Sequence, residues 1–371
     1  MIQYLAQKST IQHCFLMLCS VFVVIFLFYI TPILSPEQRA YFAYHFADFL
    51  FLSLTLVFIV VRFYNAKRDG FEHLFWLLFG GAFIAWWLLT LIFLTLWMDL
   101  SKATQNLIGG ISYFLFYALT IAAIELKSYR HANQLLSTHS SVIWLATLSF
   151  TLGAFIFLVI IPSTTTQGSV HSWPTTYLFY LLMDSYLMAR WFFLAYSTRH
   201  AHSRGYFLLG LAMTNWLIAD TIEAANYLTD FTLKSGGWID WLWFTPYLLI
   251  GVALTQPFSN LQSVSINRDF SRFNLLNSPL TFIVLILVLY AITTQNKLFD
   301  GHLTNTHYSM FTGWLVLSCI LAMGQIFLLI KQTAVLRFRL KESEFASSTF
   351  KQQLEQQAKK SNNSEIPIAP F

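Results

Sequence analysis

The ionisable side chains that lie inside long apolar stretches are few, and they are where this sequence could do chemistry. They are His45, Asp48, Asp184, Arg190, Asp220 and Glu223. A charged side chain at the centre of a membrane helix costs about 2.5 to 3.5 kcal/mol on insertion scales, so such groups usually face an interior or a water-filled cavity. Asp220 and Glu223 are spaced i, i+3 on one helix face, and Tyr227 continues that face one turn later. These groups could bind a proton or a polar ligand.

The carboxylates and aromatic residues are expected to meet near the outer side of a membrane. His45 and Asp48 are also spaced i, i+3, and Trp241 is expected at about the same depth. We therefore expect a ligand or proton pocket that opens to the outside. Two other interpretations remain open: these groups bond one another or Arg190 only to hold helices together, or they lie among lipid headgroups. Glu125, which stands near Lys127 at an inner span end, is expected among the headgroups.

The composition shows which elements must position these side chains. Of 371 residues, 56% are hydrophobic and only 11% are charged, and the mean hydropathy is +0.58. Soluble domains carry about 25% charged residues, so a soluble enzyme is excluded. The 37 Phe, 12 Trp and only 9 Pro exclude a disordered or collagen-like chain. The apolar runs are long and continuous, which predicts membrane-spanning helices rather than barrel strands.

Ten spans are predicted, with both termini in the cytoplasm. They cover residues 13–34, 46–62, 73–97, 107–126, 142–161, 175–196, 206–228, 238–253, 279–294 and 311–330. With this topology, 17 of the 22 Lys and Arg residues lie on the side of the N-terminus, four lie on the other side and Arg190 lies within a span. This asymmetry follows the positive-inside rule, so the net charge of +5 reflects topology and gives no reason to expect nucleic-acid binding. The first segment ends at Thr31-Pro32 without a small-x-small cleavage pattern and is expected to be a retained span.

The first eight spans resemble two copies of a four-helix unit. The matching features are Asp48 and Asp184 in the second and sixth spans, Gly80-Gly81 with Trp86-Trp87 and Gly210 with Trp216 in the third and seventh, and outer loops that close with Gly109-Gly110 and Gly236-Gly237. An offset of four spans is even, so the two copies would be parallel and related by an axis along the membrane normal. The predicted fold is an all-α integral membrane protein with two parallel four-helix repeats, two further helices and a cytoplasmic helical extension.

The domain organisation follows from this pattern. We expect an eight-span sensory domain at 1–256, a polar cytoplasmic linker at 257–278, a two-span transmission unit at 279–331, a cytoplasmic helix at 332–360 and a disordered tail at 361–371. The apolar residues of the cytoplasmic helix form a loose stripe, which favours a coiled coil and a homodimer; a solvated charged helix is the alternative.

Signatures of an enzyme are absent from the sequence. There is no Gly-rich phosphate loop, no His-Glu-x-x-His, no Gly-x-Ser-x-Gly and no Cys-x-x-Cys. Cys14, Cys19 and Cys319 lie within spans and have neither metal-ligand spacing nor a disulfide pattern. The Gly-x-Gly-Asp context of intramembrane aspartic proteases is also missing. We expect no catalytic residue, no metal and no cofactor.

Four segments resemble a known group of proteins. They are 179–187 (FYLLMDSYL), 210–220 (GLAMTNWLIAD), 239–247 (IDWLWFTPY) and 253–257 (ALTQP). Together they resemble the multi-span sensory regions that precede GGDEF diguanylate cyclase, EAL phosphodiesterase and histidine-kinase domains in bacteria. The resemblance covers about 80 residues well and implies a signal receptor of a bacterial inner membrane that acts as a dimer through its last helix. No output domain follows the last span, so we expect either the sensory half of a longer polypeptide or a receptor with a separate cytoplasmic signalling partner.

Three functions remain open. A sensor would pass an outer-side signal through the last helix to its cytoplasmic partner. A solute or ion transporter would also use intramembrane carboxylates and repeats. A scaffold without a ligand would recruit its partner through the cytoplasmic helix alone.

Overall fold

The computed structural model describes residues 2–30, 34–42, 46–66, 71–96, 99–129, 134–162, 173–197, 200–228, 237–256, 279–295 and 305–362. Its helices are α1 (Ile2–Ile30), α2 (Pro36–Phe42), α3 (Asp48–Asn65), α4 (Phe71–Thr95), α5 (Lys102–Tyr129), α6 (Gln134–Phe155), the π-helical turn η3 (Ile156–Ile160), α8 (Trp173–Ser197), α9 (His200–Leu228), the 3-10 turn η5 (Trp238–Asp240), α10 (Trp241–Thr255), α12 (Pro279–Gln295) and α13 (Asn305–Asn362). No strand occurs in these ranges, so the described chain is all-helical.

Within the described residues, seven helices are long and apolar enough to cross a membrane. Their apolar segments are Thr10–Ile30, Asp48–Asn65, Glu72–Thr95, Leu107–Glu125, Thr175–Tyr196, Trp238–Thr255 and Ser309–Leu328. Two shorter apolar segments, Trp144–Ile160 and Thr281–Ile292, lie in α6–η3 and α12. A span needs about 20 mostly apolar residues, so these lengths indicate a membrane-embedded, multi-pass protein.

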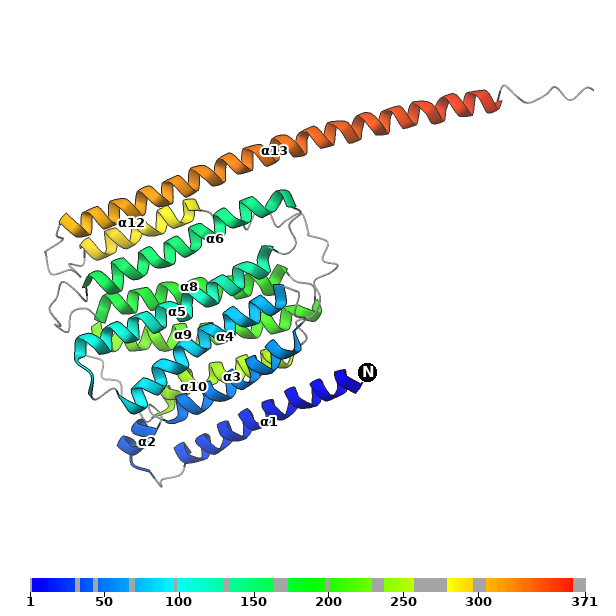
Figure 1. Cartoon of the computed structure of the whole chain (residues 1–371). Helices are drawn as coiled ribbons and strands as arrows, with labels where there is room; N and C mark the ends of the chain where they lie inside the picture. Colours follow the sequence, from blue (N-terminus) through cyan, green and yellow to red (C-terminus); the bar gives the residue numbers. More distant parts are fainter. Residues whose placement is uncertain are drawn as a thin grey trace, which may run out of the picture.

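The long helices lie side by side in one bundle (Figure 1). α13 runs along one edge beside α12 and α6, and α1 runs along the opposite edge beside α3 and α10. The start of α1 and the far half of α13 lie at the same end of the bundle. α13 continues from Leu328 to Asn362, which is about 50 Å beyond its apolar segment at 1.5 Å per residue.

Buried aromatic rings hold the centre of the bundle together. The ring of Trp191 in α8 is fully buried, 5.9 Å from the ring of Tyr206 in α9 and 6.1 Å from that of Phe79 in α4. Such aromatic pairs contribute about 0.5 to 1.5 kcal/mol each beyond the area that they bury. In a membrane, packing contacts of this kind replace water exclusion as the force between helices.

The pair Gly109–Gly110 lies inside α5, so the prediction that it closes an outer loop is wrong. α5 begins at Lys102 because the Ser101 hydroxyl accepts a hydrogen bond from the backbone N–H of Thr104 at 3.2 Å, as a helix N-cap does. A Cβ added at Gly110 would lie 3.1 Å from Val159 of η3. The glycine therefore allows α5 and η3 to approach closely.

Arg62, the last residue of the predicted span 46–62, binds the end of α10. Its Nε donates to the carbonyl of Leu254 at 2.6 Å, and its Nη2 donates to Leu254 and, at 2.7 Å, to Gln256. The last carbonyls of a helix have no partner within the helix, so a guanidinium placed there satisfies them. This contact joins α3 to α10.

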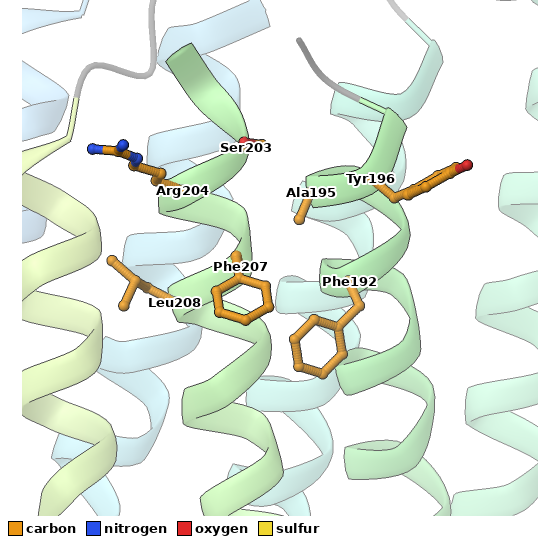
Figure 2. Close-up of a pocket in the computed structure, with 7 residues that line it drawn as sticks. All are labelled: Phe192, Ala195, Tyr196, Ser203, Arg204, Phe207 and Leu208. Atoms are coloured by element: carbon orange, nitrogen blue, oxygen red, sulfur yellow. The ribbon is translucent and has the colours of Figure 1, made fainter. Parts of the chain in front are cut away.

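A groove of about 590 Å³ lies where α8 ends and α9 begins (Figure 2). It is lined by Phe192, Ala195, Tyr196, Ser203, Arg204, Phe207 and Leu208. The expected linker at 257–278 lies outside the described residues. α13 extends to Asn362, two residues into the tail that was expected from 361.

Candidate functional site

Five carboxylates in the described bundle each accept a hydrogen bond from a tyrosine on another element. The pairs, with the distance from hydroxyl to carboxylate oxygen, are Tyr29–Asp240 (2.7 Å), Tyr117–Asp184 (2.9 Å), Tyr177–Glu223 (2.8 Å), Tyr186–Glu125 (3.0 Å) and Tyr247–Asp48 (2.6 Å). A buried carboxylate is costly unless it is hydrogen-bonded, and a phenol can satisfy it without adding charge. The hydrogen bonds from the tyrosines therefore lower the free-energy cost of burying these carboxylates in an apolar bundle.

Three of these carboxyl groups and a fourth, that of Asp220, gather around two tyrosines inside the bundle. Tyr113 of α5 is within electrostatic range of Asp48, Asp220 and Glu223. Tyr180 of α8 is within range of Asp220, Glu223 and also Asp184. The two tyrosine rings lie 4.9 Å apart. We call Asp48, Asp184, Asp220 and Glu223 the carboxyl cluster.

Asp184 of α8 and Asp220 of α9 interact electrostatically with each other within the carboxyl cluster. Both are buried, since only 2% of Asp184 and 8% of Asp220 is exposed. Oδ2 of Asp184 has no hydrogen-bond donor among the described residues. Two carboxyl groups can bond to each other only through a proton, because a carboxylate is an acceptor alone. Two neighbouring buried carboxyl groups are therefore suited to share a proton.

Two tryptophans lie beside the carboxyl cluster. The rings of Trp86 in α4 and Trp216 in α9 are 5.1 Å apart, and Tyr247 lies 6.1 Å from the first and 5.7 Å from the second. Nε1 of Trp216 is buried and has no hydrogen-bond partner among the described residues. The site therefore combines carboxylates with aromatic faces, a combination that suits protons and cations.

Two of the aspartates each bind a tyrosine from the other half of the chain. Asp48 in α3 binds Tyr247 in α10, and Asp184 in α8 binds Tyr117 in α5. Gly80, Trp86 and Tyr117 recur as Gly210, Trp216 and Tyr247, each 130 residues later. Helix contacts follow the same rule, since α3 contacts α10 while α8 contacts α5, and α1 contacts α10 while α6 contacts α5.

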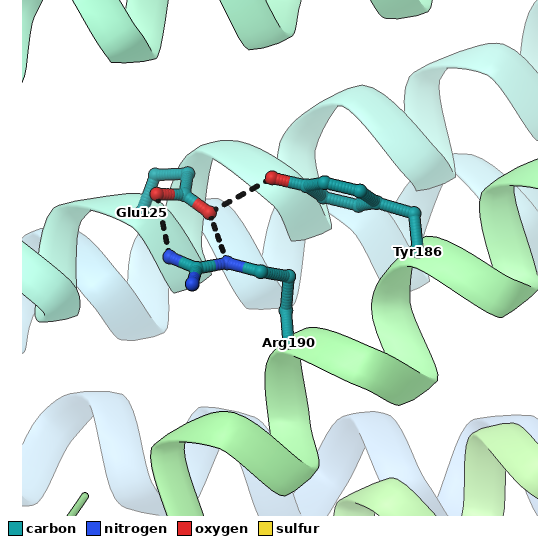
Figure 3. Close-up of polar contacts among 3 residues, drawn as sticks. All are labelled: Glu125, Tyr186 and Arg190. Carbon is teal, nitrogen blue, oxygen red and sulfur yellow. Dashed lines mark hydrogen bonds and ion pairs between the residues drawn. The ribbon is translucent and has the colours of Figure 1, made fainter. Parts of the chain in front are cut away.

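Arg190 forms a separate polar site with Glu125 (Figure 3). Its Nε and Nη2 donate to the two carboxylate oxygens of Glu125 at 2.7 and 2.8 Å, while Tyr186 donates to Oε1. Glu125 is fully buried in this ion pair, so the expectation that it lies among headgroups is wrong. Arg190 thus neutralises Glu125, six residues along α8 from Asp184.

The remaining predicted site residues lie elsewhere. Trp241 packs against α1, with its ring 4.9 Å from that of Phe22 and 5.3 Å from that of Tyr29, beside Asp240. Its ring packs between α1 and α10. It is not among the residues grouped around Tyr113 and Tyr180. Tyr227 lies in α9, but its side chain lies outside the described part of the chain, as does all of His45.

Ring contacts continue from Tyr186 to the last helix. Tyr186 lies 6.5 Å from Phe282 of α12, Phe282 stacks on Phe150 of α6 at 4.8 Å, and Phe150 lies 5.7 Å from Trp314 of α13. Trp314 sits directly on Gly153 of α6, where a side chain would clash with its indole nitrogen. These contacts form a continuous packed path from α8 to α13.

The described residues contain no group of three or more His, Cys, Asp and Glu side chains placed to hold a metal ion. Comparisons with models of protein families, with curated proteins and with solved structures found no match for this chain.

Proposed function

We propose that this protein is a receptor of the bacterial inner membrane, in which a change at the carboxyl cluster moves α13 relative to the bundle. The observation that carries the proposal is the packed path from Tyr186, two residues along α8 from Asp184, through Phe282 and Phe150 to Trp314. Coupling between distant sites needs a packed element with two arrangements that both sites bias. A proton or ligand would act by binding one arrangement better than the other.

The proposed topology has ten spans. α6–η3, α9 and α12 would cross the membrane with the seven longer apolar helices, and both termini would be cytoplasmic. The excess of Lys and Arg on the side of the N-terminus supports this orientation. The carboxyl cluster then lies in the outer half of the bundle, and the extension of α13 lies in the cytoplasm.

The proposed core is a duplicated four-helix unit, with α1, α3, α4 and α5 in one copy and α6, α8, α9 and α10 in the other. The spacing of 130 residues and the reciprocal bonds Asp48–Tyr247 and Asp184–Tyr117 support it. A two-fold axis along the membrane normal would bring equivalent residues together, and Trp86 and Trp216 meet at 5.1 Å. Each unit would thus hold the other through one aspartate–tyrosine bond.

The proposed output element is the extension of α13. Phe338, Phe345 and Phe350 are each more than 60% exposed, although they are large and apolar. Exposed apolar side chains on a long helix suit contact with a second copy or with a cytoplasmic signalling protein. The resemblance to sensory regions that precede cyclase, phosphodiesterase or kinase domains points to such a partner.

Hydrogen–deuterium exchange of the full chain in nanodiscs tests this proposal. Asp184→Asn removes the carboxyl group, which can carry a charge or a proton. The amide oxygen of the asparagine can still accept the hydrogen bond from Tyr117. We expect it to change backbone exchange along α13, near Trp314. Asp99→Asn, at an exposed position beyond α4, is the matched control and should leave α13 unchanged. If Asp184→Asn leaves exchange in α13 equal to that of the control, the receptor proposal fails.

A transporter is the second candidate, and the Asp184–Asp220 pair favours it, because a carboxyl pair inside a repeat fold can couple proton binding to movement of the repeats. Proton or solute uptake into proteoliposomes that is lost in Asp184→Asn and kept in Asp99→Asn would establish transport in place of reception.

A further inference from the structure

The groove between α8 and α9 has an apolar floor and a charged edge (Figure 2). Phe192 and Phe207 face each other across it, with ring centroids 5.5 Å apart. Arg204 lies about one turn from Phe207, toward the start of α9, and Ser203 lies beside it. A ligand that fills this groove would need an apolar part that lies over Phe192 and Phe207 and a negative group that lies at Arg204.

Arg204 has no hydrogen bond or ion pair with any described residue, and its side chain is exposed. In contrast, the guanidinium of Arg190 is used by Glu125, and that of Arg62 is used by carbonyls of α10. A guanidinium presents several donors in a fork that matches phosphate oxygens. Within the described part of the chain, nothing competes with an outside anion for the Arg204 guanidinium.

The groove lies at the end of the apolar segment of α8, where a membrane–water interface is expected. The apolar segment of α8 ends at Tyr196, which is 84% exposed, and tyrosine is typical of the membrane–water interface. Arg204 lies at this same end of the bundle, and Phe207 lies about 4.5 Å deeper along α9. α1 begins at this end of the bundle, and α13 extends beyond the bundle at the same end. By the sequence, this is the side that carries most of the Lys and Arg residues.

We propose that this groove binds one anionic phospholipid, with its phosphate at Arg204 and an acyl chain over Phe192 and Phe207. Charge complementarity selects the occupant, because Arg204 is the one charged side chain among the described residues that line the groove, and basic pockets between membrane helices bind anionic headgroups. A soluble anion would gain nothing from the apolar floor. The site is separate from the carboxyl cluster, so it holds whether or not the protein is a receptor.

Native mass spectrometry of the full-length protein tests the site. The protein is released from nanodiscs that contain equal amounts of phosphatidylglycerol and phosphatidylcholine, and the lipids that stay bound are counted. We expect the wild type to keep one phosphatidylglycerol in preference to phosphatidylcholine. Arg204→Gln should weaken this binding about fivefold, which corresponds to about 1 kcal/mol for one basic residue near the surface. Arg204→Lys should keep part of the preference, and Phe207→Ala should reduce retention of both lipids.

Lys331→Gln is the matched control, because Lys331 is exposed just beyond the apolar segment of α13, at the same end of the bundle. It should leave the retained phosphatidylglycerol unchanged. The proposal is overturned if Arg204→Gln and Lys331→Gln retain the same lipids as the wild type. It is also overturned if millimolar inorganic phosphate displaces the lipid, since the groove would then bind a free anion.

Discussion

Arg190 of α8 and Glu125 of α5 form a two-pronged ion pair inside the bundle, and no more than 5% of either side chain is exposed. Tyr186 completes the site by donating to the same carboxylate. A buried ion pair of this kind adds little net stability over apolar residues, yet losing one partner leaves a buried charge unpaired. The pair thus fixes how α5 and α8 are placed beneath the carboxyl cluster.

Breaking this ion pair from one side should destabilise the protein strongly. We expect Arg190→Met or Glu125→Met alone to lower the free energy of unfolding by about 3 to 5 kcal/mol. The double variant should recover much of that loss, because no unpaired charge remains. Unfolding of the purified protein in mixed micelles measures all three, and equal stability of the single variants and the wild type would contradict the buried pair.

The hydrogen bonds Asp184–Tyr117 and Asp48–Tyr247 should contribute about equally to the free energy of unfolding. Tyr117→Phe and Tyr247→Phe each remove one donor, and each should cost about 0.6 kcal/mol and at most about 1.7 kcal/mol, as hydrogen bonds between membrane helices do. Double-mutant cycles with Asp184→Ala and Asp48→Ala, which remove the acceptors, measure the two coupling energies. Tyr64→Phe, at a residue that is 76% exposed, is the control and should be neutral. Coupling at only one of the two bonds would count against a duplicated unit.

The contact between Gly153 and Trp314 should be intolerant of any side chain. Gly153→Ala places a methyl group against the indole, so we expect a loss of about 1 to 3 kcal/mol from overpacking and a looser α13. Gly313→Ala is the matched control one residue away from Trp314, because nothing lies within 4 Å of a Cβ there. It should be neutral or slightly stabilising. Equal unfolding free energies of the two variants would contradict the contact between Gly153 of α6 and Trp314 of α13.

The apolar runs predicted the helices well, because a membrane helix must satisfy its own backbone and so appears as a long uninterrupted segment. The partners of single residues were harder to predict. Glu125 was expected among headgroups since its pairing with Arg190, 65 residues away, depends on how α5 packs on α8. The tyrosine donors were missed because tyrosine is common at membrane interfaces, although the spacing from Gly80 to Tyr117 and from Gly210 to Tyr247 carried a signal.

The central claim is that the carboxyl cluster and the extension of α13 are coupled, and a spin-label distance measurement tests it most directly. Labels are placed at Tyr64→Cys and Ser347→Cys, both exposed, after Cys14, Cys19 and Cys319 are replaced by serine. We predict that Asp184→Asn with Asp220→Asn shifts or broadens the distance distribution relative to the unsubstituted cluster. Superimposable distributions, in a protein that stays folded and monodisperse, would contradict the account.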